Sequence, residues 1–132
     1  MVLPRHVLKH IRLQLARSKA FPSGSPRHGY DIVAPLDAEG HIDPELWRQH
    51  RNACRVRRFW DDQEEVGHLV HRPGGAEHAR WTFDYGEANA EDEETGYRFG
   101  VHKFLPGEYV SIRDHDGELH TFVVARVEPL PQ

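Results

Sequence analysis

The histidine pair best placed to do chemistry is His115 and His120, in a sequence that contains eleven histidines. They flank Asp116-Gly117, a dipeptide typical of a tight turn between two strands, and would face each other across that hairpin. Asp114 or Asp116 would lie beside them, but neither is a convincing third ligand for a metal ion. We therefore expect no metal centre and no other built-in cofactor.

Other chemical motifs are weak or absent. His68 and His71 are three residues apart and would point to opposite faces of a strand, so they should not share a metal. Cys54 has no motif that places a base beside it, and is most simply a small buried hydrophobic residue. The sequence lacks H-E-x-x-H, C-x-x-C, Walker and dinucleotide-binding motifs. A single cysteine rules out an internal disulfide framework and fits a reducing cytoplasm.

Carboxylates are concentrated in two acidic runs, residues 61–65 and 91–94. Runs of charge usually form solvated surface, and paired carboxylates need burial to separate their pKa values for acid–base work. We therefore expect both runs to be exposed. The second run lies in the polar stretch 86–95, which should be a mobile hairpin loop that folding does not need.

The stretch 55–60 interleaves arginines with Phe59 and Trp60, a pattern that can stack the bases of single-stranded nucleic acid. The simpler interpretation is that Arg55 and Arg57 lie on a solvated face and pair with the acidic loops. A formal net charge of −4 and the lack of a wider basic patch favour that interpretation. Nucleic acid is therefore an unlikely partner.

The elements that would position these residues are organised around the range 79–127, which reads as a β-meander. Trp81, Phe83 and Tyr85 alternate with polar residues, as expected for a strand with one buried face. Turns at Pro106-Gly107 and Asp116-Gly117 separate the later runs. The strands expected here are 79–85, 97–104, 109–114 and 118–127.

The first half of the chain adds four strands and one helix to this pattern. Residues 11–15 alternate as a strand does, although apolar residues every fourth position from Leu3 to Leu15 also allow an amphipathic helix. Asp43 and Pro44 form a clear helix start, and the helix should run to about Asn52 and cover one end or flank of the sheet. The remaining strands are expected at 29–35, 54–60 and 66–72.

These elements predict a single all-β, or nearly all-β, domain over residues 1–132: an antiparallel barrel or strongly curled sheet of about eight strands with one short helix. There is no βαβ alternation. No apolar run approaches the roughly 20 residues that a membrane-spanning helix needs, so we expect no membrane association.

Strand alternation then gives a hypothesis for a ligand site. The inward apolar set is expected to be Ile11, Leu13, Leu15, Tyr30, Ile32, Val56, Val66, Val70, Trp81, Phe83, Tyr85, Phe99, Val101, Val110 and Ile112. The same parity turns Arg58 and His68 inward. A buried arginine is costly unless it is paired, so Arg58 should lie near a rim or hold an anion. Arg58, His68 and Trp81 are our candidate residues for a small anionic or aromatic ligand.

The sequence therefore predicts a non-enzymatic binding or interaction module, whose partner is such a ligand or another protein. The alternative is a small hydrolase or isomerase with a histidine-containing site in the barrel mouth. A single-stranded nucleic-acid adaptor is the second alternative. A cavity lined by convergent polar groups would favour a ligand or a substrate, and a filled interior would favour an interaction module.

Overall fold

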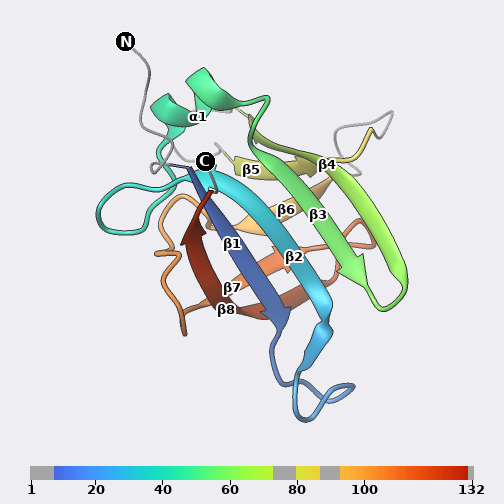
Figure 1. The fold of residues 1–132 in the computed structure, drawn as a ribbon. Coiled ribbons are helices and arrows are strands. Elements are labelled where there is room, and N and C mark those ends of the chain that lie inside the picture. The colour runs from blue at the N-terminus through green and yellow to red at the C-terminus, as the bar shows by residue number, and fades with distance from the viewer. Residues whose placement is uncertain (1–7, 73–79, 87–92, 131–132) are drawn as a thin grey trace.

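The computed structural model describes residues 8–72, 80–86 and 93–130. Within them, eight strands form a closed antiparallel barrel in which each strand pairs with the next and β8 pairs back with β1 (Figure 1). The predicted all-β barrel is therefore confirmed. The elements are β1 (Leu8–Leu15), β2 (Ser25–Pro35), α1 (Pro44–His50), β3 (Arg55–Trp60), β4 (Gln63–Arg72), β5 (Arg80–Asp84), β6 (Glu94–Tyr97), β7 (Tyr109–Arg113) and β8 (Leu119–Pro129). No helix among the described residues is long and apolar enough to cross a membrane.

Residues 8–15, for which the sequence allowed a strand or an amphipathic helix, form a strand, β1. Ile11, Leu13 and Leu15 are buried, as the alternation predicted. β1 also closes the barrel, since Ile11 pairs with Ile32 of β2 on one side and with Val127 of β8 on the other. Pairing on both edges satisfies the backbone groups of β1, which an isolated amphipathic helix would have satisfied internally.

Helix α1 begins where the sequence indicated and covers one end of the barrel (Figure 1). The carboxylate of Asp43 accepts hydrogen bonds from the backbone N–H groups of Glu45 and Leu46, at 2.9 and 3.2 Å, as an N-cap residue does. Trp47 is buried, and its indole Nε1 donates to the carbonyl oxygen of Leu69 on β4 at 2.8 Å. This bond fixes the helix to the end of the barrel.

The sixth strand differs from its predicted position. We expected a strand over 97–104, whereas β6 lies earlier and Arg98 to Val101 form a turn. Phe99 is buried as predicted, but from that turn, and the prediction that Val101 faces inward is wrong because it is 69% exposed. The turn requires Arg98 to adopt a φ of 53°, which a bulky side chain rarely adopts.

The parity of β4 was also predicted wrongly. Val66 is 52% exposed, and Gly67 and Leu69 are the buried residues instead. A Cβ added to Gly67 would lie 2.1 Å from the backbone oxygen of Asp84 and 2.9 Å from the ring of Tyr85. The ring of Tyr85 therefore occupies the space that a side chain at position 67 would need. The pattern Val66-x-His68-x-Val70 follows the outer face of the barrel.

Candidate functional site

A group of polar side chains meets inside the barrel, in a region we call the polar cluster: Tyr30, Arg58, Tyr85, Glu94 and His115. Strand alternation places the first members. Tyr30 on β2 pairs with Arg58 on β3, and Glu94 on β6 pairs with Phe83 on β5, two residues before Tyr85. Tyr85, one residue beyond the end of β5, joins the same group because its hydroxyl donates to Glu94. His115 joins the group from the turn between β7 and β8.

Glu94 lies at the centre of the polar cluster and is only 1% exposed. Its Oε1 accepts hydrogen bonds from the hydroxyls of Tyr30 and Tyr85, both at 2.9 Å. Its Oε2 lies 3.4 Å from Nε of Arg58 and 3.8 Å from Nδ1 of His115. Among the described residues neither Oε2 nor the buried Nε of Arg58 makes a hydrogen bond. The two charged groups are thus close enough to attract each other but not bonded.

Burial determines the electrostatics of this cluster. Removal of Glu94 from water raises the pKa of its carboxyl group above 4.5, although Tyr85, Arg58 and Tyr30 partly offset the shift. Burial, and then the negative charge of Glu94, raises the pKa of both tyrosines, so neither ionises at neutral pH. Burial opposes the charged form of Arg58, but Tyr30 and Glu94 outweigh it and the pKa rises. Glu94 is therefore the member of the buried group whose charge can change.

The polar cluster reaches solvent through His115, whose side chain is 52% exposed. Arg58 approaches the same end of the barrel, and its guanidinium carbon lies 4.4 Å from the ring centre of Trp60, a cation–π geometry. Trp60 in turn packs edge-on against Phe122 of the core. This end, near the β3–β4 hairpin, lies away from α1 (Figure 1).

A second candidate site lies at the other end, in a hollow of about 510 Å³ between α1, β4, β5 and the turn after β6. We call it the helix-end hollow. Its lining includes His71, Arg80, Trp81 and Arg98 together with apolar residues such as Ile42 and Phe99, and no carboxylate lines it among the described residues. Its volume is within the range of small-molecule pockets. Two guanidinium groups, those of Arg80 and Arg98, line it.

The aromatic wall of this hollow is tightly packed. The ring centres of His71 and Trp81 are 4.4 Å apart, and Trp47 meets Trp81 edge-on at 5.5 Å. Burial, and then the nearby Arg48, lowers the pKa of His71 below 6.5, so the neutral imidazole is favoured at neutral pH. The indole Nε1 of Trp81 has no hydrogen-bond partner among the described residues and lies 4.0 Å from the position a Cβ on Gly100 would take. An open hydrogen-bond donor thus borders the hollow.

The structure does not bring the three predicted ligand residues together. Arg58 belongs to the polar cluster, while Trp81 is only 2% exposed and lines the helix-end hollow. Arg58 pairs with Glu65 on β4 and Trp81 pairs with His71, so their backbones are on the order of 20 Å apart along that strand. Arg58 was expected to lie near a rim or to hold an anion, and the structure places its Nε 3.4 Å from Glu94 Oε2.

His68 lies elsewhere again. It is on the same outward face of β4 as Val66, and not inside the barrel as predicted. There it lines a small hollow of about 160 Å³ beside α1, together with Arg51 and Trp47. The error follows from the β4 parity, because the inward position next to it belongs to Gly67.

The acidic run 91–94 was expected to be solvated, and for its described residues that expectation is wrong. Glu93 and Glu94 are both buried. Glu93 accepts two hydrogen bonds from Arg72, at 2.6 and 3.1 Å, while Glu94 enters the polar cluster. The stretch 86–95, which we expected folding not to need, therefore ends in structural residues. Residues 87–92 lie outside the described part of the chain, so their mobility stays a prediction.

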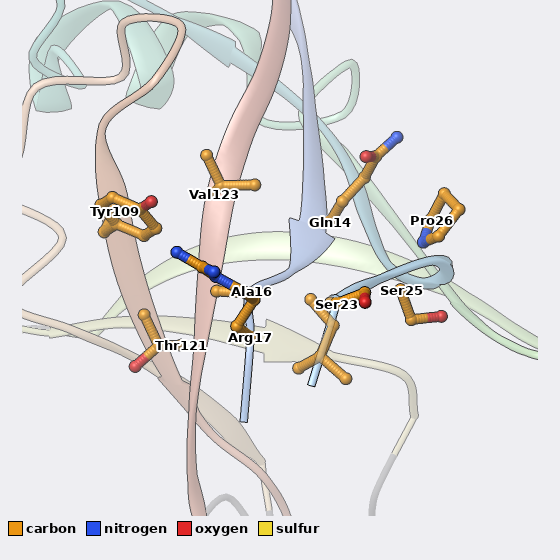
Figure 2. Close-up of a pocket in the computed structure, with 11 residues that line it drawn as sticks. Gln14, Ala16, Arg17, Ser23, Ser25, Pro26, Tyr109, Thr121 and Val123 are labelled. Carbon is orange, nitrogen blue, oxygen red and sulfur yellow. The ribbon is translucent and has the colours of Figure 1, made fainter. Parts of the chain in front are cut away.

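A third hollow, of about 550 Å³, lies on the outer face between the β1–β2 connection and strands β7 and β8 (Figure 2). Figure 2 shows Arg17, Ser23, Tyr109 and Thr121 around it. Arg17 is its one charged residue among the described lining and is itself exposed. Without a buried charged or catalytic group, this hollow supports no particular chemistry.

The predicted histidine pair of the β7–β8 hairpin does not converge on one point. His120 bonds Asp114 at 3.0 Å, whereas His115 turns toward Glu94. Asp114, Glu118 and His120 do place potential ligand atoms within 4.8 Å of one another. However, Asp114 already accepts hydrogen bonds from the backbone N–H groups of Asp116 and Glu118. An aspartate held in this way is explained by its role in the turn.

Comparison with known proteins adds no assignment to this geometry. No protein-family model, curated protein or solved structure shows a significant match to the chain.

Proposed function

We propose that this protein binds a small organic anion with an apolar or aromatic body in the helix-end hollow. The observation that carries the proposal is a hollow of about 510 Å³ that combines two arginines, an aromatic wall and no carboxylate among its described lining residues. A concave, largely apolar site with a few converging polar groups is the usual form of a ligand pocket.

Each part of the hollow has a role in such binding. Arg80 is exposed, has no ion-pair partner among the described residues, and offers a planar fork that matches a carboxylate or phosphate. Trp81 and Phe99 line the hollow although they are only 2% and 1% exposed, the exposed Val101 adds apolar surface for the body of the ligand, and the indole N–H of Trp81 provides a donor. Arg98 contributes at the rim from its strained φ of 53°, a conformation that costs about 1–3 kcal/mol and is more frequent at functional sites.

The alternatives have less support. A nucleic-acid adaptor needs free aromatic faces, but Phe59 is buried with the guanidinium of Arg12 at 4.2 Å and that of Arg57 at 5.2 Å from its ring centre. Trp60 has Arg58 over its ring. A hydrolase or isomerase in the barrel mouth would use His115, yet Glu94 Oε2 lies 3.8 Å from its Nδ1, too far for a hydrogen bond that would orient the imidazole for acid–base work.

Isothermal titration calorimetry with benzoate, and with benzyl alcohol as its uncharged counterpart, tests the proposal. Benzoate should bind, benzyl alcohol should bind far more weakly, and Arg80→Gln should weaken benzoate binding about tenfold or more through loss of a charge-assisted hydrogen bond. Arg126→Gln is the matched control, because Arg126 is an exposed arginine on β8 whose partner is Glu128. If benzoate fails to bind, or binds Arg80→Gln as well as Arg126→Gln, the proposal is wrong.

A further inference from the structure

A second binding site is suggested by the polar cluster, because its charged groups are brought together without completing their hydrogen bonds. Nε of Arg58 is buried and unbonded among the described residues. Nε of Arg58 lies 3.4 Å from Glu94 Oε2, and Nη1 of Arg58 lies 3.9 Å from Glu65 Oε1. Both distances are longer than an ordinary N–H···O bond of about 2.9 Å. A guanidinium in this state gains free energy from any small acceptor that reaches it.

The approach to this guanidinium is defined by three side chains. The Trp60 ring lies against one face of Arg58, and the exposed His115 stands on the solvent side of Glu94. His115 is also 4.0 Å from Asp116, so it is not committed to a short bond on either nitrogen among the described residues. A small oxyanion at the barrel mouth would thus meet the N–H donors of Arg58 and a ring N–H of His115. Both are suited to carboxylate and phosphate oxygens.

A bound anion would lie close to the negative charge of Glu94. Glu94 and the incoming anion would share one guanidinium at close range, and two negative charges so near each other in a poorly solvated site are unfavourable. Protonation of Glu94 removes the repulsion between the two negative charges. Burial already favours the protonated form, because it raises the pKa of this carboxyl group. Its other neighbours, the hydroxyls of Tyr30 and Tyr85, stay neutral and cannot take up the charge.

We propose that the mouth of the barrel binds a small oxyanion between Arg58 and His115, and that Glu94 takes up a proton as the anion binds. The site is separate from the helix-end hollow, and the ligand is a small carboxylate or phosphate with no apolar body. The proton comes from solvent, and no covalent bond of the ligand changes.

Calorimetry with acetate and with inorganic phosphate distinguishes the two sources of the oxyanion. Titrations at one near-neutral pH in imidazole and in bis-tris, two cationic buffers with different ionisation enthalpies, report the number of protons exchanged. The wild type should bind at least one of the two anions with net proton uptake. Glu94→Gln should still bind but take up no proton, and Arg58→Gln should bind at least tenfold more weakly.

Two further variants keep the result interpretable. His115→Asn changes an exposed side chain, so it should fold normally, weaken binding and leave proton uptake by Glu94 in place. Arg80→Gln, in the helix-end hollow, should bind acetate and phosphate as the wild type does. The double variant Arg58→Gln/Glu94→Gln leaves no unpaired charge from this pair and should fold even where the single Arg58 variant does not, without binding either anion.

The proposal is overturned if neither acetate nor phosphate binds, if the double variant binds as tightly as the wild type, or if proton uptake persists in Glu94→Gln. Uptake that disappears only in His115→Asn would assign the proton to the histidine and also contradict it. Because benzoate binding is tested by Arg80→Gln and oxyanion binding by Arg58→Gln, each proposal can fail without the other.

Discussion

Replacing Tyr30 by phenylalanine removes a single hydroxyl from the interior and leaves the ring in place. That hydroxyl donates to Glu94 Oε1 at 2.9 Å, and Tyr30 is only 1% exposed, so water cannot replace the bond. A hydrogen bond to a charged group contributes about 1.5–3 kcal/mol. Since Tyr85 still donates to the same oxygen, the expected loss is in the middle of this range, about 2 kcal/mol.

Urea denaturation at neutral pH measures this loss directly, with an unchanged m value showing that the variant unfolds in the same way. For a chain of 132 residues and an unfolding entropy of about 2.1 cal/mol/K per residue, 2 kcal/mol corresponds to a fall in Tm of about 7 °C. Tyr109→Phe is the control, because Tyr109 is 60% exposed and should change stability by less than about 0.5 kcal/mol. Equal stability of the two variants would refute the buried Tyr30–Glu94 contact.

Four other results are expected from the same structure. Glu94→Gln should remove a pH dependence of the free energy of unfolding. Because the pKa of Glu94 in the folded protein lies above 4.5, the folded wild type holds a proton that the unfolded chain loses, so the stability of the wild type should fall relative to that of the variant as pH rises above 4.5. Melting temperatures of the two proteins that change in parallel with pH would contradict this. Gly29→Ala should unfold the barrel, because the added Cβ would lie 1.9 Å from the backbone oxygen of Leu13. Gly100→Ala is the control: the nearest atom to its added Cβ is 4.0 Å away, so the free energy of unfolding in a urea titration should fall by less than about 1 kcal/mol. Cys54, buried and with a pKa raised to about 12, should resist iodoacetamide at pH 8 until denaturant is added; rapid labelling of the native protein, followed by mass spectrometry, would show that the thiol is accessible. EDTA should leave Tm unchanged because Asp114 is already satisfied by backbone donors, and a fall of several degrees that one specific ion reverses would reveal a structural metal.

The strands were predictable from the sequence wherever one face is apolar and the other polar. Ile11, Leu13 and Leu15 show this in β1, and Trp81 and Phe83 show it in β5. The predicted inward face of β4 was wrong, because Val66 points outward and is 52% exposed. A glycine carries no hydrophobic signal, so the inward position of Gly67, filled by the ring of Tyr85, could not be read from local periodicity.

The candidate site was less predictable than the fold, because it depends on partners far apart in sequence. A buried arginine is costly unless it is paired, and that requirement at Arg58 was the one signal in the sequence for an inward carboxylate. The partner, Glu94, stands in an acidic run that looks solvated, and the strand that carries it was expected three residues later. The helix-end hollow could not be predicted either, since it is formed by the turn of Arg98 against α1.

Closure of the barrel has a kinetic consequence. The pair Ile11 and Val127 joins the first and last strands, so the seam that removes both exposed sheet edges is among the longest-range contacts in the chain. Contacts of this kind require a large loop-closure entropy and slow folding, and until they form β1 and β8 remain open templates for pairing with another chain. Refolding should therefore be limited by the joining of these two strands. Variants that weaken the seam should lose yield to aggregation at high protein concentration before they lose much equilibrium stability.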